Sequence, residues 1–158
     1  MPPVPRLLVI AGSDSSAGAG LQADLKTAQR FGVYAQTAVT AVTVQNTRGV
    51  TAIQAMLPEI VRGQIRAALD DIGADAIKVG MLANAQIACV VADALMETDI
   101  PLVLDPVLVS TSGSLLLEPA ALKILKYRLL PRATLVTPNL PESEALVDIL
   151  PSDDQTVH

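Results

Sequence analysis

Aromatic residues and cysteine are scarce in this sequence, and each shortage excludes a class of protein. The aromatic side chains are Phe31, Tyr34 and Tyr127, too few for a platform on which nucleic-acid bases stack. The net charge of −5 also argues against a nucleic-acid-binding surface. Cys89 is the one cysteine, which excludes a disulfide within the chain and a cysteine-based zinc cluster.

Long apolar runs are missing as well. No uninterrupted apolar stretch reaches membrane-spanning length, and none before Gly12 is long enough for a signal peptide. We therefore expect a cytoplasmic protein with neither a nucleic-acid nor a membrane partner. The 158 residues are 51% hydrophobic, enough for one domain with a sizeable core. We expect an α/β domain over residues 1–150 and a polar tail over 151–158.

Segments with strand spacing and segments with helix spacing alternate along the chain. Strands are expected over residues 7–11, 34–44, 50–56, 76–79, 101–104 and 133–137. Helices are expected from residue 20 and over 58–71, 84–98, 119–131 and 141–150, with a loop at 110–114. This alternation predicts a mostly parallel sheet with helices on both faces. Ligands of such sheets bind beyond the carboxyl ends of the strands, which directs attention to the residues there.

The loop after the first expected strand contains Gly12, Gly18 and Gly20. A helix that begins near Gly20 directs free N–H groups and its positive dipole end toward this loop, which suits an anionic or polar ligand. Tight packing of the strand against the helix is an equally good reason for the glycines. Asp24 lies one turn into the helix on its buried side, where a carboxylate needs a partner, and a donor on a ligand is one candidate.

A dinucleotide-binding fingerprint is present only in part. Gly18-x-Gly20-x-x-Ala23 matches its glycine pattern, but no acidic residue occurs between Asp24 and Glu59 to bind the ribose. A P-loop is excluded because no Lys-Ser or Lys-Thr pair follows these glycines. The glycines therefore do not indicate a nicotinamide or flavin site.

Further polar or soft side chains follow the later strands. Asp105 suits a metal or phosphate site, although a solvated loop carboxylate is as good an interpretation. Taken alone, Gln45 is best interpreted as an exposed loop amide, and Met81 as an ordinary side chain of the core. Asn139 and Glu142, three residues apart where a helix begins, fit an ordinary helix cap.

Several segments, in the same order, resemble the hydroxymethylpyrimidine/phosphomethylpyrimidine kinases of thiamine biosynthesis. They are Ala11–Thr27, Thr40–Thr47, Ile77–Leu82, Val103–Val107, Leu129–Pro131 and Thr137–Glu142. The resemblance implies a ribokinase-like fold and a homodimer. It implies transfer of the γ-phosphoryl group of ATP, with Mg²⁺, to the hydroxymethyl group of the pyrimidine and then to the monophosphate.

The resemblance also implies a role for individual residues. Asp24 and Gln45 would bind the aminopyrimidine, whose exocyclic amine and ring nitrogens suit a carboxylate and an amide. The residues that would line the pocket are Gly12, Ala19, Met81 and Val107. The residues near magnesium would be Asp105 and Glu142, and those near the nucleotide phosphates Asn139 and Glu142.

One departure from the family concerns catalysis. The family continues to a Gly-Thr-Gly-Cys-like loop that supplies an anion hole and the catalytic residue, whereas the last glycine here is Gly113. We therefore expect a C-terminally truncated form of the fold, and we assign no catalytic residue. A non-catalytic pyrimidine-binding fragment is the alternative to a kinase. Since phosphoryl transfer depends on such donors, we expect no useful ATP turnover by this chain alone.

Overall fold

A computed structural model describes residues 3–108 and 118–147. The loop expected at 110–114, the tail at 151–158 and the last residues of the final expected helix lie outside this part. The strands are β1 (Arg6–Asp14), β2 (Tyr34–Asn46), β3 (Gly49–Ala55), β4 (Ala76–Val79), β5 (Leu102–Leu104) and β6 (Leu135–Val136). The α-helices are α1 (Gly20–Arg30), α2 (Pro58–Ala67), α3 (Ala85–Met96), α4 (Pro119–Ile124) and α5 (Leu140–Val147).

Short helical turns continue two of these helices. A π-helical turn at Ala68–Ile72 follows α2, and turns at Leu125–Leu129 and Leu130–Arg132 follow α4. Two helix starts predicted from the sequence are confirmed. Pro58 is the first residue of α2, and the Asn84 side chain accepts a hydrogen bond of 2.9 Å from the Ile87 N–H at the start of α3. Among the described residues, no helix is both long and apolar enough to cross a membrane.

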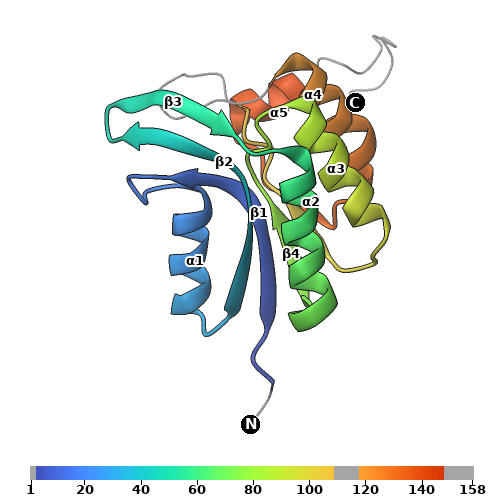
Figure 1. Ribbon diagram of the computed structural model, residues 1–158. Coiled ribbons are helices and arrows are strands. Elements are labelled where there is room, and N and C mark those ends of the chain that lie inside the picture. The colour runs from blue at the N-terminus through green and yellow to red at the C-terminus, as the bar shows by residue number, and fades with distance from the viewer. Residues whose placement is uncertain (1–2, 109–117, 148–158) are drawn as a thin grey trace, which may run out of the picture.

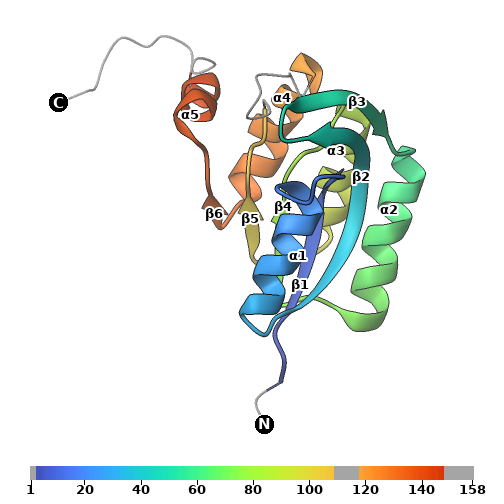
Figure 2. The ribbon, with the colours of Figure 1, turned by 90° about the vertical axis from the view of Figure 1, so that its left-hand side faces the viewer.

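The six strands form one sheet in the order β3-β2-β1-β4-β5-β6. All neighbours pair in parallel except β3, which runs antiparallel to β2. Figure 1 shows α1 on one face of the sheet and α2 and α3 on the other, and Figure 2 shows the same sandwich from the α1 side. The mostly parallel sheet with helices on both faces is therefore confirmed.

Burial alternates along β1, the strand that pairs with β2 and β4. Leu8 and Ile10 pack into the large core beneath α2 and α3, whereas Val9 packs with Leu21 of α1 on the opposite face. All three β1 side chains are fully buried. A strand that is covered on both faces is continuously apolar, which is the pattern read from the sequence.

Two strands are longer than the sequence predicted. β1 continues through Gly12 to Asp14, and β2 continues through Gln45 to Asn46. The pairing of β1 with β2 is irregular between Ala11 and Ser13. Polar and glycine residues can extend these strands because backbone pairing continues after the apolar runs end, between β1 and β2 as far as Asp14 and between β2 and β3 as far as Asn46. Gly12 and Gln45 therefore lie within strands, near their ends, and not in the loops after them.

A buried hydrogen bond joins β2 to the segment after β4. Thr40 is fully buried, and its hydroxyl donates to the Met81 carbonyl over 2.6 Å. We predict that Thr40→Val lowers the free energy of unfolding by about 1–3 kcal/mol, because the carbonyl would lose its partner in the core. Urea denaturation measures the change. Thr37→Val, at a half-buried position on the same strand, is the control. Equal small effects of the two substitutions would contradict the prediction.

Candidate functional site

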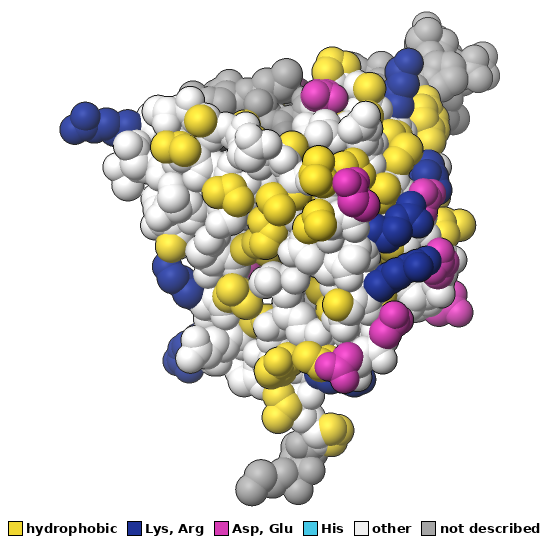
Figure 3. All heavy atoms as spheres, in the orientation of Figure 1, with side chains coloured by type: hydrophobic (Ala, Val, Ile, Leu, Met, Phe, Trp, Pro, Cys, Tyr) yellow, Lys and Arg dark blue, Asp and Glu magenta, His cyan; other side chains and the backbone are white. Residues whose placement is uncertain are grey.

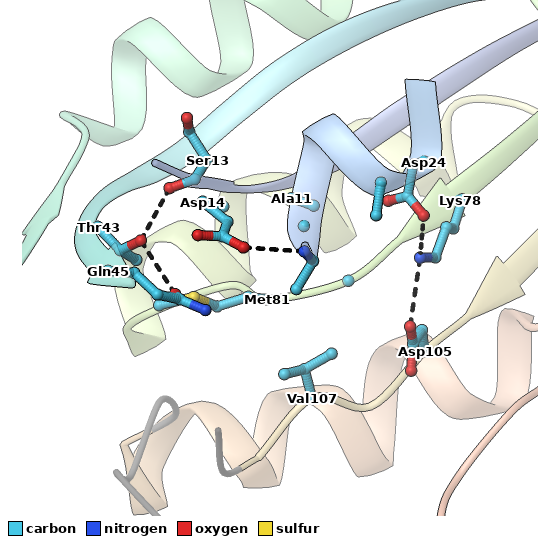
Figure 4. A pocket seen from close by; sticks show the side chains of 15 residues that line it. Ala11, Ser13, Asp14, Asp24, Thr43, Gln45, Lys78, Met81, Asp105 and Val107 are labelled. Atoms are coloured by element: carbon cyan, nitrogen blue, oxygen red, sulfur yellow. Dashed lines mark hydrogen bonds and ion pairs between the residues drawn. The ribbon is translucent and has the colours of Figure 1, made fainter. Parts of the chain in front are cut away.

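A cavity of about 320 Å³ lies at the carboxyl edge of the sheet, next to the start of α1. Seven of the nine predicted site residues line it: Gly12, Ala19, Asp24, Gln45, Met81, Asp105 and Val107. They come from β1, α1, β2 and the segments that follow β4 and β5 (Figure 4). The parallel strands bring these residues together although they are far apart in the sequence.

Asp14 organises the loop between β1 and α1. Its carboxylate is 3% exposed and accepts hydrogen bonds from the backbone N–H groups of Ser16, Gly18 and Ala19, at 2.8, 3.0 and 2.8 Å. The Ser16 hydroxyl donates to it as well. The Gly18 and Ala19 N–H groups of this loop are therefore occupied by a carboxylate of the chain itself. The Asp14 carboxylate does not take the N–H groups of α1 from Gly20 onward, so a polar ligand at the start of this helix remains a prediction.

The glycines at this site allow close packing. Gly20 has φ of +54°, and a Cβ there would lie 2.4 Å from the Gly12 carbonyl oxygen. A Cβ at Gly12 would in turn lie 2.9 Å from the sulfur of Met81. Strand-to-helix packing, one of the two interpretations of these glycines, is thus what the structure shows.

Lys78 of β4 joins two of the predicted site residues. Its Nζ lies 2.6 Å from Oδ1 of Asp24 and 3.3 Å from Oδ2 of Asp105 (Figure 4). Burial lowers the pKa of Lys78, but the hydrogen bond and charge of Asp24, helped by Asp105, outweigh burial and raise it overall. Asp24 thus has a protein partner for one oxygen. Its Oδ2 is buried and has no hydrogen-bond partner among the described residues.

Gln45 is held at the other end of the cavity. Its backbone N–H donates to the Ser15 hydroxyl oxygen at 2.8 Å, and its carbonyl accepts from the same hydroxyl at 2.7 Å. The Thr43 hydroxyl lies 3.1 Å from Oε1 of Gln45 and 3.0 Å from the Ser13 carbonyl. These contacts fix the backbone of β2 against β1 and orient the carboxamide.

Asn139 and Glu142 lie outside the residues that line the cavity. Oδ1 of Asn139 accepts from the Glu142 N–H, and Oε2 of Glu142 accepts from the Asn139 N–H, both at 2.9 Å. This reciprocal pair is a capping box at the start of α5. The helix-cap interpretation of the two residues is confirmed, and their roles near the nucleotide and magnesium remain predictions.

The comparison with known proteins identifies the family. Residues 14–158 match the model of the phosphomethylpyrimidine kinase family. The chain belongs to this family.

Two curated relatives of this kinase family illustrate the match, and both are hydroxymethylpyrimidine/phosphomethylpyrimidine kinases. That of Mycobacterium tuberculosis (strain CDC 1551 / Oshkosh) is 53% identical, over 92% of this chain and 54% of the relative. That of Streptomyces coelicolor is 48% identical, over 97% of this chain and 58% of the relative. The chain therefore spans little more than half the length of these relatives.

Solved structures of related kinases have the same fold. The phosphomethylpyrimidine kinase of Clostridium difficile 630 aligns with a TM-score of 0.85 at 42% identity, covering 93% of this chain and 64% of the other. Pyridoxal kinase of Staphylococcus aureus in complex with pyridoxal aligns with a TM-score of 0.83 at 36% identity, covering 93% and 53%. The fold of this chain is the ribokinase-like fold of these kinases.

Two functional candidates, Lys78 and Asp14, were missed by the sequence analysis. Lys78 is the one charged residue of β4, and a lysine in so short and apolar a strand is a signal of a buried charge partner. Asp14 stands between an apolar strand and a loop of small residues, where a carboxylate commonly caps free N–H groups. Both signals were present in the sequence, although neither names the partner.

The close approach of α1 to β1 leads to a prediction about Gly20. Gly20→Ala should lower the free energy of unfolding by well over the roughly 1–2 kcal/mol that a left-handed backbone costs any non-glycine residue. The additional loss comes from the collision with the Gly12 carbonyl. Gly32→Ala is the matched control, because Gly32 has φ of +69° and no atom within 4 Å of an added Cβ. Denaturation midpoints that fall equally in the two variants would contradict the account.

The lowered pKa of Asp14 leads to a prediction about the stability of the fold at acid pH. Burial raises the pKa of Asp14, but hydrogen bonds from Ser16, Ala19 and Gly18 outweigh burial and hold it below 3.8. A lowered pKa in the folded state stabilises the fold above the unfolded pKa, and this stabilisation is lost as the pH falls below about 4. Arg6 lowers the pKa of Asp75 to about 2, so Asp75 adds to the same loss.

We therefore predict that unfolding measured from pH 7 to pH 2 shows a steep loss of stability below about pH 4. Asp14→Asn should be less stable at pH 7 and should lose less stability over the acid range. An unchanged acid slope in this variant would count against the role given to Asp14.

Proposed function

We propose that this protein is an ATP-dependent kinase that phosphorylates 4-amino-5-hydroxymethyl-2-methylpyrimidine and its monophosphate in thiamine biosynthesis. The observation that carries the proposal is a cavity of about 320 Å³ that brings the carboxylate of Asp24 together with the carboxamide of Gln45. Family membership and curated relatives of this name support the assignment.

The cavity suits an aminopyrimidine in chemistry as well as in size. The carboxylate of Asp24 can accept a hydrogen bond from the exocyclic amine, and the Gln45 carboxamide can pair with a ring nitrogen. Gly12 and Ala19 are small residues that line the cavity. Met81 and Val107 offer apolar contact to the ring. Few polar groups in a mostly apolar cavity are typical of small-molecule sites, where they fix the ligand's orientation.

Asp105 and the residues at the start of α5 are assigned to the binding of magnesium and the nucleotide phosphates. Magnesium in nucleotide sites is commonly held by one or two carboxylates together with substrate phosphates, so Asp105 at the cavity fits as one such carboxylate. Within residues 3–108 and 118–147, no cluster of three or more histidine, cysteine or acidic side chains could hold a metal by itself. Magnesium would neutralise charge on the phosphates. Glu142 and Asn139 would approach the nucleotide through the N-terminus of α5.

Pyridoxal is the comparison ligand, since the Staphylococcus aureus neighbour was solved with it. Pyridoxal lacks the exocyclic amine and the second ring nitrogen and carries a phenolic hydroxyl instead, so its polar groups match the Asp24 carboxylate and the Gln45 carboxamide less well, and a polar group left unpaired in the cavity costs about 1–3 kcal/mol. We therefore expect calorimetry to show tighter binding of 4-amino-5-hydroxymethyl-2-methylpyrimidine than of pyridoxal. Pyridoxal binding as tight as that of the pyrimidine would overturn the substrate assignment.

A coupled ADP-release assay with ATP, magnesium and the same pyrimidine tests the transfer step. ADP release that depends on the pyrimidine supports the kinase. Because we expect no useful turnover by this chain alone, the assay is repeated with a chain extended through the glycine loop of the family. Pyrimidine binding without ADP release in both supports the alternative, a module that binds the pyrimidine without catalysis.

The role of Gln45 gives a direct prediction. Gln45→Ala should weaken binding of the hydroxymethylpyrimidine by about 1–3 kcal/mol, because ring nitrogens would lose their partner inside the cavity. Calorimetry measures the loss. Gln54→Ala, at an exposed position on β3, is the matched control and should leave the affinity unchanged. Unchanged affinity in Gln45→Ala would contradict the assignment of Gln45 to pyrimidine binding.

A further inference from the structure

Thr43 is a buried polar residue of β2 that lies beside the cavity. The side chains of Ala41 and Thr43 are buried, whereas those of Val42 and Val44 are exposed, so the strand has one covered face and one open face. Gln45 follows Thr43 by two positions and continues the covered face. Both Thr43 and Gln45 line the cavity (Figure 4).

The Thr43 hydroxyl is the group that holds the side chain of Gln45. Its oxygen lies 3.1 Å from Oε1 of Gln45 and 3.0 Å from the carbonyl oxygen of Ser13 in β1. The contacts of Gln45 with Ser15 involve only the backbone of Gln45. Within the part of the chain that the structure describes, no other hydrogen bond reaches the carboxamide.

The chemistry of a hydroxyl group lets Thr43 keep this contact in two ways, because it has one proton and can also accept a hydrogen bond. Thr43 can donate to Oε1 of Gln45. It can also donate to the Ser13 carbonyl and accept from the carboxamide N–H after a half-turn of the amide. Thr43 therefore restrains the Gln45 side chain whichever end of the amide meets a ligand.

Gln45 depends on such a restraint because its side chain is long and lies near the end of β2. A free glutamine side chain samples many rotamers, and fixing it on binding lowers the affinity for a ligand. Thr43 is a suitable anchor, because its β-branched side chain is stiff and its hydroxyl also contacts the backbone of β1.

We infer that Thr43 is a positioning residue for pyrimidine binding: its hydroxyl holds the Gln45 carboxamide at the cavity before the ligand binds. The inference rests on the proposed function, in which the carboxamide pairs with the ring. It requires no contact between Thr43 and the ligand. It assigns to a buried hydroxyl a part of the affinity that the cavity has for the pyrimidine.

The test is calorimetry with 4-amino-5-hydroxymethyl-2-methylpyrimidine on the wild-type chain and on Thr43→Val, which keeps the shape of the side chain and removes the hydroxyl. We expect binding to weaken by about threefold to tenfold, as for the fixing of one long side chain. Thr43→Ser keeps the hydroxyl and should recover most of the affinity. Thr37→Val, at a half-buried position on the same strand and outside the cavity lining, should leave the affinity unchanged.

A Gln45→Ala background separates positioning from a general structural effect. Thr43→Val should cause no further loss of affinity in this background, because the side chain that it positions is absent. Thr43→Ala carries the same comparison if Thr43→Val does not fold. A similar loss in both backgrounds, or no loss in either, would overturn the role of Thr43.

The same measurements separate this inference from the proposed function. Failure of the wild-type chain to bind the pyrimidine would overturn the proposed substrate and this inference with it. Wild-type binding that Gln45→Ala leaves unchanged would overturn the inference and the role of Gln45, but not the substrate. Wild-type binding that Gln45→Ala weakens and Thr43→Val does not would overturn only the inference.

Discussion

The burial of β1 between β2 and β4 is the constraint on which the other features depend. With α1 on one face of the strand and α2 and α3 on the other, its side chains must be apolar on both sides. The polar and glycine residues can therefore appear only where the strand leaves the core, at Gly12 to Asp14. Parallel pairing then sets the ends of β2, β4 and β5 beside that point. The cavity follows from this arrangement of the strand ends together with the start of α1, which supplies Asp24.

Charges at the cavity are arranged so that the chain itself satisfies most of them. Asp14 takes N–H groups of the loop before α1, and Lys78 takes one oxygen each of Asp24 and Asp105. Few groups remain for a ligand, namely the carboxylates of Asp24 and Asp105 beside Lys78 and the carboxamide of Gln45. A site prepared in this way discriminates by hydrogen bonding, since a ring without the matching donor leaves a polar group of the cavity unpaired.

The sequence was sufficient for the sheet, because alternating strand and helix patterns and the apolar run of β1 follow from local periodicity. The seven residues that share the cavity were predicted from the family resemblance of the motifs that contain them. Lys78 was missed because its partners lie 54 and 27 positions away, and no local pattern encodes such a contact. The partners of Asp14 were not predicted either, because a sequence does not show that this carboxylate folds back beneath the loop N–H groups. Asn139 and Glu142 are joined in a cap, which local spacing did predict.

The central claim is that the cavity recognises an aminopyrimidine through Asp24. A crystal structure of the chain with 4-amino-5-hydroxymethyl-2-methylpyrimidine tests it most directly. The account predicts the ring between Met81 and the loop before α1, with the exocyclic amine within hydrogen-bond distance of the Asp24 carboxylate. A ring bound elsewhere, or bound in the cavity with its amine turned away from Asp24, would contradict the account.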